Sequence, residues 1–300
     1  MKIIVILNGI SRKKKKFYSE ILPLLQKKFE IIVEETSYAG HAAQLATEAL
    51  SKNYDCILAA GGDGTLHQVI NGILSANANQ TIPSLGLIPL GSGNDFATTC
   101  RLSFNASSIV ELLEANQPKP TDVGKISCHD EQGNAITKCF INACSVGMGP
   151  ATVQQMEKSP KWLSSDIRYL TSILHTFFNH QPAPLSIKME SWGWSGKARV
   201  FAIANGKSFG NKIFIAPDAI QDDGFLNSFL AGEVPLLKFL LFLQSLKQKK
   251  KIVDDKISYS LAKRIELSST EKVMLEAEGE LVGYLPARIE VMPSRILFFR

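Results

Sequence analysis

The sequence of 300 residues lacks any long apolar run, and none approaches the ~18 consecutive apolar residues expected of a membrane-spanning helix. The longest such stretch, residues 234–246, is interrupted by Pro235, Lys238 and Gln244. Cysteines are few, and none of the five has a Cys-x-x-Cys spacing, which argues against a disulfide framework or a zinc site. The N-terminus has no signal-peptide pattern. These absences predict a cytoplasmic protein with reduced thiols.

Two common nucleotide-binding motifs are also missing. No segment has the glycine, lysine and serine or threonine spacing of a Walker loop. The dinucleotide fingerprint fails because His67 stands where its third glycine would be. Aromatic residues are not interleaved with the lysine runs, as a stacking platform for nucleic acid would require. The sequence therefore predicts no nucleic-acid partner.

What the sequence does contain is two glycine-rich loops, 61–65 and 91–96, each directly after an apolar run that predicts a buried strand. Apolar residues at helical spacing follow the first loop and predict a helix. Glycines let a backbone approach a phosphate, while free N–H groups and the helix dipole favour the anion. Each loop also holds an aspartate suited to work with Mg²⁺, Asp63 or Asp95. Together the loops predict a phosphate site at the ends of two strands.

The order of predicted elements changes along the chain and predicts two domains. Over residues 1–118, strands alternate with helices, the pattern of right-handed βαβ units and a parallel sheet. A proline-containing stretch, 117–120, marks the boundary. Residues 119–293 are rich in short β-like stretches, one of them 139–144, with helices near 164–178 and 235–247. The expected fold class is α/β: an N-terminal three-layer nucleotide domain and a C-terminal antiparallel β-sandwich.

The net charge of +5 is concentrated in two lysine runs, 13–16 and 247–251. A solvated surface is the usual explanation of such runs. The alternative is attraction to anionic lipid headgroups, which contributes roughly 1 kcal/mol for each basic residue near a membrane. Under that alternative the protein is peripheral to the inner face of the membrane. The sequence leaves the oligomeric state open, including a homodimer.

The two loops resemble those of the diacylglycerol kinase family and its bacterial lipid-kinase relatives. The matching strings are Gly-Gly-Asp-Gly-Thr at 61–65, with Leu-His-Gln-Val-Ile-Asn-Gly after it, and Gly-Ser-Gly-Asn-Asp-Phe at 91–96. NAD kinases and phosphofructokinases resemble the first string but not the second. The resemblance implies ATP and Mg²⁺ as cofactors, a catalytic domain of NAD kinase/diacylglycerol kinase type over 1–118, and a return of residues 294–300 to that domain.

The same resemblance implies which residues bind the nucleotide. They come from the end of the first strand, from the second strand end and from the two loops. They are Asn8, Ser11, Lys13, Thr36, Gly61, Gly62, Asp63, Gly64, Thr65, His67, Gly91, Ser92, Asn94 and Asp95. Gly9 and Arg12 depart from the family's Asn-Pro-x-Ser-Gly pattern. Asp63 and Asp95 would link the nucleotide to a catalytic metal, with Asp122 as a supporting residue.

Residues 215–225 resemble a loop that binds a structural Mg²⁺ in bacterial lipid kinases. The match implies the carboxylate of Asp223 and the carbonyls of Ile220 and Phe225 as ligands, which are oxygen donors suited to a hard cation. The alternative is an Asp-Gly turn between two strands.

The acidic stretch 276–280 supplies the candidate general base. If it is a strand, Glu276, Glu278 and Glu280 share one face, and their crowding should raise at least one pKa. The family has Asp-Gly-Glu here, so matching by position implies Glu278 as the base and Glu280 as its support. Glutamate keeps the carboxylate but adds a methylene. The competing explanation is a solvated acidic turn.

The expected function is that of an ATP-dependent transferase that phosphorylates a membrane lipid, diacylglycerol to phosphatidic acid being the reaction that the resemblance favours. Such a reaction belongs to phospholipid biosynthesis. One alternative is an NAD-kinase-like phosphotransferase with a soluble acceptor, which the second glycine string argues against. The other is a non-catalytic lipid- or nucleotide-binding regulator, supported by the altered 8–13 segment and the glutamate at 278.

Overall fold

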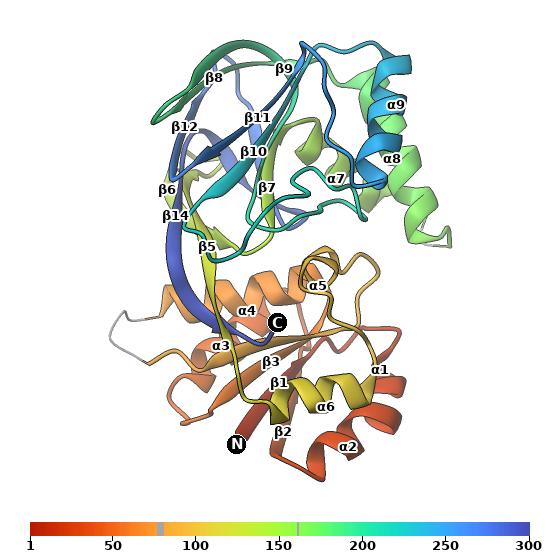
Figure 1. Ribbon diagram of the computed structural model, residues 1–300, viewed down its shortest axis with the longest axis vertical. Helices are drawn as coiled ribbons and strands as arrows, with labels where there is room; N and C mark the ends of the chain where they lie inside the picture. The colour runs from red at the N-terminus through yellow and green to blue at the C-terminus, as the bar shows by residue number, and fades with distance from the viewer. Residues whose placement is uncertain (77–80, 161) are drawn as a thin grey trace. The chain divides into compact units, whose positions relative to one another are not determined.

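The structure, a computed structural model, describes residues 1–300 except 77–80 and 161. The chain divides into two compact units (Figure 1). Unit 1 comprises Met1–Thr121 and Ser294–Arg300, and unit 2 comprises Asp122–Pro293. The chain therefore passes twice between the units, and the C-terminal residues belong to the first one.

Unit 1 is built on apolar strands that pair in parallel. Their order is β4-β3-β1-β2, and each strand pairs with its neighbour over at least five residues. At the other edge of β4, Phe298 near the C-terminus pairs with Leu85. The strands are β1 (Lys2–Leu7), β2 (Glu30–Glu35), β3 (Cys56–Gly61) and β4 (Ser84–Pro89).

Helices cover both faces of this sheet. Residues at alternate positions of β1, from Ile3 to Leu7, pack with Phe17, Ile21 and helix α6 on one face. Helices α3 and α4 pack on each other, on β1 and on β3. The helices are α1 (Lys14–Lys16), η1 (Phe17–Ile21), α2 (Leu22–Gln26), α3 (His41–Ala49), α4 (Asp63–Ser75), α5 (Asp95–Cys100) and α6 (Ala106–Glu114).

Unit 2 is a sandwich of antiparallel strands. Strands β7, β9, β8, β12, β14 and β13 pair antiparallel in a closed circuit, because the long strands β9 and β14 each pair with several partners. The strands are β5 (Lys119–His129), β6 (Ala135–Phe140), β7 (Ala143–Gly147), β8 (Ala183–Met189), β9 (Gly193–Ala204), β10 (Leu226–Gly232), β11 (Ile257–Ala262), β12 (Arg264–Ser268), β13 (Met274–Ala277) and β14 (Glu280–Phe298). The first residues of β5 and the last residues of β14 belong to unit 1.

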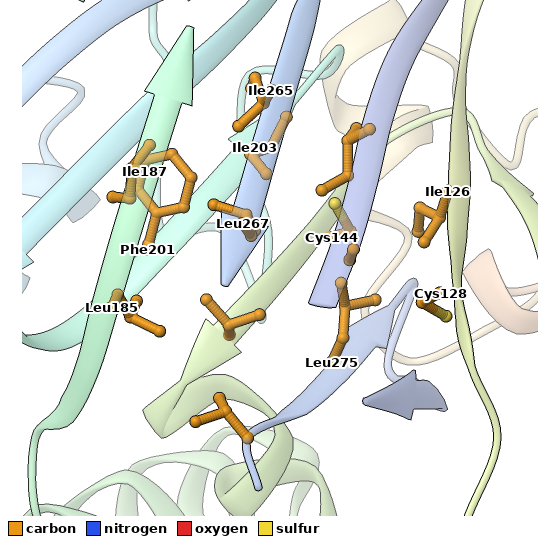
Figure 2. Close-up of a cluster of buried hydrophobic side chains, with 14 of the residues drawn as sticks. Ile126, Cys128, Cys144, Leu185, Ile187, Phe201, Ile203, Ile265, Leu267 and Leu275 are labelled. Atoms are coloured by element: carbon orange, nitrogen blue, oxygen red, sulfur yellow. The ribbon is translucent and has the colours of Figure 1, made fainter. Parts of the chain in front are cut away.

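The interior of this sandwich is apolar. Figure 2 shows side chains from β5, β7, β8, β9, β12 and β13 converging on one cluster, with Phe201 and Leu275 among its members. Each fully buried large side chain of this kind stabilises the fold by about 1.5–3 kcal/mol relative to an exposed one.

Three helices cover the outer face of β7, β9 and β10 in unit 2. They are α7 (Met148–Lys158), α8 (Ser165–Asn179) and α9 (Leu236–Lys247). Phe177 of α8 and Phe239 of α9 contact each other, with ring centroids 4.6 Å apart. Of the helices in the described part of the chain, none has the length and apolar character needed to cross a bilayer.

The expected α/β class with a C-terminal β-sandwich is confirmed, and the whole set of strands is mixed, parallel in unit 1 and antiparallel in unit 2. One predicted strand is wrong. The stretch 139–144 is interrupted, since β6 ends at Phe140 and β7 begins at Ala143. The N–H groups of Ile141 and Asn142, the residues at this break, donate to a side chain, as described below.

Candidate functional site

The carboxyl ends of the parallel strands bring the predicted nucleotide-binding segments of unit 1 together. After β1, Asn8 Nδ2 donates a hydrogen bond to Thr65 Oγ1 at 3.2 Å, in the first glycine loop. The next residue, Gly9, donates from its N–H to Thr36 Oγ1 at 3.1 Å, at the end of β2. Segments that lie far apart in the sequence therefore meet at one edge of the sheet.

The two glycine loops contact each other through their backbones. The N–H of Leu90 donates to the carbonyl of Gly61 at 2.8 Å. A Cβ placed on Gly91 would lie 2.4 Å from the Cα of Gly62, which no side chain tolerates. Gly62 and Gly91 are thus required for the backbones of the two loops to touch. The sequence pattern alone does not distinguish this role from phosphate binding.

Asp63 joins the loops a second time. Its carboxylate accepts hydrogen bonds from the N–H of Asp95 and of Phe96, both at 3.1 Å, at the start of α5. Burial raises the pKa of Asp63, the negative charge of Asp95 raises it further, and these two N–H groups oppose the rise. The side chain therefore positions the second loop, and its position beside Asp95 disfavours the charged form of its carboxyl.

The basic segment after β1 reaches the second loop. Ser11 Oγ donates to the carbonyl of Leu90 at 3.3 Å, and Lys13 Nζ donates to the carbonyl of Gly91 at 3.4 Å. Asn94 adopts a left-handed conformation, with φ at 56°, and its side chain both accepts from and donates to the backbone of Gly91. The loop is thereby folded back on itself with a cation at its rim.

Most of the predicted nucleotide-binding residues thus lie in one region of unit 1. His67 lies within α4, past the glycine loop, and is buried, with the Asn71 amide 3.4 Å from its ring nitrogens. Sequence reasoning missed Phe104, whose ring lies 5.4 Å from Lys13 Nζ and 5.1 Å from Lys16 Nζ. No motif signals that residue. Backbone N–H groups, a helix N-terminus and a lysine together suit a polyphosphate.

In unit 2 the acidic stretch is a hairpin, and the expectation that its three glutamates share one strand face is wrong. Ala277 of β13 pairs with Glu280 of β14, so Glu278 and Gly279 form the two-residue turn. Both have positive φ, 56° and 79°. Such turns favour Asp-Gly or Asn-Gly. This preference explains the aspartate in the Asp-Gly-Glu pattern that the stretch resembles.

Glu278 is held by the break between β6 and β7. Its Oε1 accepts hydrogen bonds from the N–H of Ile141 at 2.9 Å and of Asn142 at 2.6 Å. Its own N–H donates to the carbonyl of Ala143 at 3.0 Å. One carboxylate oxygen is therefore fixed, so the orientation of the other is fixed too.

Glu276 is fully buried beneath this turn. The Ser145 hydroxyl donates to its Oε1, and the Gly279 N–H donates to its Oε2 at 3.1 Å. Burial raises the pKa of Glu276 to about 7, against the effect of these two donors. One glutamate of the stretch thus has a raised pKa, as expected, but desolvation causes it and crowding by like charges does not.

The predicted metal loop is fastened to Asp122, which is fully buried. The Asp122 N–H donates to the carbonyl of Gln221, and Asp122 Oδ2 accepts from the N–H of Gly224, both at 2.7 Å. Asp223 is exposed, and its Oδ1 accepts from the N–H of Phe225 at 2.9 Å. Supporting the loop is therefore a role that the structure gives to Asp122.

A Mg²⁺ ion needs several oxygen ligands around it. Across residues 1–76, 81–160 and 162–300, no three His, Cys, Asp or Glu side chains group closely enough to hold a metal. The loop instead offers exposed carboxylates, with Asp223 among them, and backbone carbonyls in the same segment. It fits a hard cation that keeps part of its water shell.

A separate hollow in unit 2, of about 450 Å³, is lined by polar residues such as Ser127, Lys188 and Arg288. It contains none of the predicted site residues. The candidate residues of unit 2 are therefore those of the hairpin and the predicted metal loop, and not those of this hollow.

Two family models match the chain. Residues 2–126 match the diacylglycerol kinase catalytic domain, and residues 142–300 match the YegS C-terminal NAD kinase beta sandwich-like domain. The second match alone covers more than half of the chain. Between them the matches include both glycine loops, the metal loop and the Glu278 turn.

Individual proteins resemble the chain over nearly its full length. "Probable lipid kinase YegS" of Escherichia fergusonii is 26% identical over 294 residues, 98% of this chain and 94% of that protein. Diacylglycerol kinase of Bacillus subtilis is 26% identical over 276 residues, 91% of this chain and 86% of that protein. A diacylglycerol kinase structure from Bacillus anthracis has the same fold, with a TM-score of 0.74, 21% identity, and coverage of 99% and 96% of the two chains.

Proposed function

Because this chain belongs to the diacylglycerol kinase family, with the C-terminal domain of the YegS-like members, we propose that it is an ATP-dependent lipid kinase. The acceptor is the hydroxyl of a membrane lipid, with diacylglycerol, converted to phosphatidic acid, as the first choice. The observation that carries the proposal is the joining of two glycine loops, each with an aspartate, at the ends of parallel strands.

ATP binds in unit 1 under this proposal. The β- and γ-phosphates lie against the N–H groups of the glycine loops and the first turn of α4, where the helix dipole favours an anion. Lys13 contributes its positive charge from the rim of the second loop. Asn8, which donates to Thr65, and Thr36, which accepts from Gly9, hold the adjoining segments of the same region.

Glu278 of unit 2 acts as the general base. Its carboxylate takes the proton from the lipid hydroxyl as the hydroxyl oxygen attacks the γ-phosphorus in line, and the bond between the γ-phosphorus and the bridging oxygen of ADP breaks. Hydrogen bonds from Ile141 and Asn142 support this role, because they orient one oxygen and leave the direction of the other defined.

Mg²⁺, when bound with the nucleotide, neutralises charge on the phosphates. Asp63 and Asp95 are the residues we assign to that ion, because a bound cation would offset the repulsion that raises the pKa of Asp63 beside Asp95. A second, structural ion is assigned to Asp223 with the carbonyls of Ile220 and Phe225. This ion would stabilise the loop that Asp122 anchors.

The remaining assignments follow from the acceptor. A lipid acceptor places the enzyme at the inner face of the membrane, as a peripheral cytoplasmic protein. We assign the catalytic domain to residues 1–118 with 294–300, and the sandwich to 119–293. A homodimer is compatible with this function but is not needed by it.

The test uses the purified full-length chain, γ-labelled ATP, Mg²⁺ and a total lipid extract. We expect one labelled lipid class, with a phosphate on a former hydroxyl, and no label when Mg²⁺ is chelated. A chain that binds ATP yet labels no lipid would be a regulator that lacks catalysis. In a parallel reaction with NAD in place of the lipid extract, label on the dinucleotide would instead indicate an NAD-kinase-like enzyme.

A further inference from the structure

Helix α9 has more apolar residues than its buried face can use. Eight of its 12 residues are Leu or Phe, and they occur on all sides of the helix. Only Phe239 and Leu246 are buried. A helix that is apolar all round is normally enclosed by protein or by lipid. Something therefore covers α9 on the side that unit 2 leaves open.

The uncovered side of α9 is a stripe of leucines. Leu237, Leu240 and Leu241 have exposed fractions of 73%, 38% and 54%. Their spacing of three and four residues places them on one face of the helix. Single exposed leucines are ordinary, but three on one face make a continuous apolar surface.

Helix α8 repeats the arrangement. Ile173 and Phe177 point into the core, where Phe177 contacts α9 through Phe239. On the outside, Ile167, Leu170 and Phe178 are exposed, and Leu174 between them is half-buried. Both helices lie in the layer that covers β7, β9 and β10 (Figure 1). We call Ile167, Leu170, Phe178, Leu237, Leu240 and Leu241 the α8–α9 surface.

Positive charge lies directly beside this surface. Lys247 ends α9, and Lys249 and Lys250 follow it. Within the described residues, no carboxylate pairs with any of these three lysines, whereas Lys251 pairs with Asp218 at 2.6 Å. A protein-binding face that buried these lysines would need acidic partners on the other molecule. A bilayer containing anionic lipids supplies both an apolar interior and the negative charge.

We propose that the α8–α9 surface docks on an anionic phospholipid bilayer, with its apolar side chains in the headgroup–acyl boundary and its lysines on the phosphates. The inference deepens the proposed function, on which it rests, by naming the part of the chain that contacts the membrane. Helices of this kind lie in the plane of the interface and do not cross it. Trp162, 83% exposed just before α8, belongs to the residue type that prefers this boundary.

The test measures binding of the full chain to phosphatidylcholine vesicles, with and without phosphatidylglycerol, by cosedimentation without nucleotide. We expect binding only to the anionic vesicles, and weaker binding at high salt. Trp162 should shift its emission to shorter wavelength on binding, and the Trp162→Phe protein should bind without that shift.

Matched variants separate the surface from general effects. Leu237→Gln/Leu241→Gln should weaken vesicle binding by about tenfold or more, because each leucine loses its apolar burial. Leu297→Gln, at a residue 45% exposed in unit 1, should leave it unchanged. Lys247→Gln/Lys250→Gln should weaken vesicle binding roughly fivefold per lysine. Lys27→Gln/Lys52→Gln removes the same amount of charge away from the surface and should weaken vesicle binding much less.

Three results would overturn the inference. The first is vesicle binding that does not depend on phosphatidylglycerol. The second is a loss of vesicle binding in the control variants as large as in the α8–α9 variants. The third is a dimer, seen by sedimentation, that the Leu237→Gln/Leu241→Gln protein cannot form. The last result would assign the surface to a second copy of the chain. Failure of the proposed function is distinguishable. If the chain docks on vesicles but phosphorylates no lipid, even a short-chain diacylglycerol in solution, the docking inference stands and the proposed kinase function is wrong.

Discussion

The buried carboxyl of Glu276 should make the stability of unit 2 fall as the pH rises through neutrality. Its pKa is raised by burial from 4.5 to about 7, so the folded protein holds this proton more tightly than the unfolded chain does. The stabilisation is complete below about pH 4.5 and is lost as the pH rises to about 7. At about 1.36 kcal/mol per pKa unit, the whole effect is about 3 kcal/mol.

The substitution Glu276→Gln isolates this effect, because glutamine stays neutral and still offers an oxygen to the Gly279 N–H and an amide to Ser145. We expect the variant to gain stability relative to wild type on going from pH 5 to pH 8, by about 2–3 kcal/mol. Glu266→Gln, at an exposed position on β12, is the matched control and should show no such change.

Tryptophan fluorescence during urea unfolding is the suitable assay. All three tryptophans are in unit 2, and Trp192 and Trp194 pack on the core of its sandwich. The signal therefore reports the unit that contains Glu276. A difference between variant and wild type that is the same at pH 5 and pH 8 would refute the argument, since it would mean that Glu276 is solvated in the folded protein.

Three further perturbations test the rest of the site. Asp63→Asn should reduce turnover at least about a hundredfold. It should also lower the free energy of unfolding by about 1 kcal/mol, because asparagine keeps only one of the two hydrogen bonds to α5. Activity within a few-fold of wild type would count against the role assigned to Asp63. Asp223→Ala should abolish the rise in melting temperature on adding Mg²⁺, which for wild type at a hundredfold excess over Kd corresponds to about 2.7 kcal/mol. Gly91→Ala should cost about 1–3 kcal/mol and weaken ATP binding, because its Cβ overlaps Gly62, whereas Gly193→Ala, with more room, should do neither.

Local sequence signals were sufficient for the arrangement of unit 1. Apolar runs followed by glycine turns predict parallel strands, and parallel strands end at the same edge of a sheet. The meeting of Asn8, Thr36 and the two loops follows from that rule. What the sequence could not show is that Gly62 and Gly91 touch, because a glycine needed for backbone contact and one needed for phosphate binding look alike.

The hairpin at 276–280 shows where the prediction failed. Alternating glutamates suggest a strand, but the Glu-Gly pair forms a turn because Gly279 readily adopts a positive φ. The break at Ile141 and Asn142 could not be predicted either, since its hydrogen bonds go to Glu278, more than 130 residues away. Burial of Glu276 depends on the same long-range packing. The exposure of leucines on α9 was equally hidden, because a leucine-rich helix has the same composition whether its leucines are buried or exposed.

The measurement that tests the central claim most directly is lipid-dependent turnover of Glu278→Gln, with ATP affinity determined separately. A positioned carboxylate base contributes about 10²–10⁴ in rate, so turnover should fall by that factor while ATP affinity is retained. Glu278→Asp should remain active, because aspartate suits the same turn, and Glu280→Gln should lose less activity than Glu278→Gln. Normal turnover of Glu278→Gln with an inactive Glu280→Gln would move the base by two residues. Normal turnover of both would contradict the account of this site.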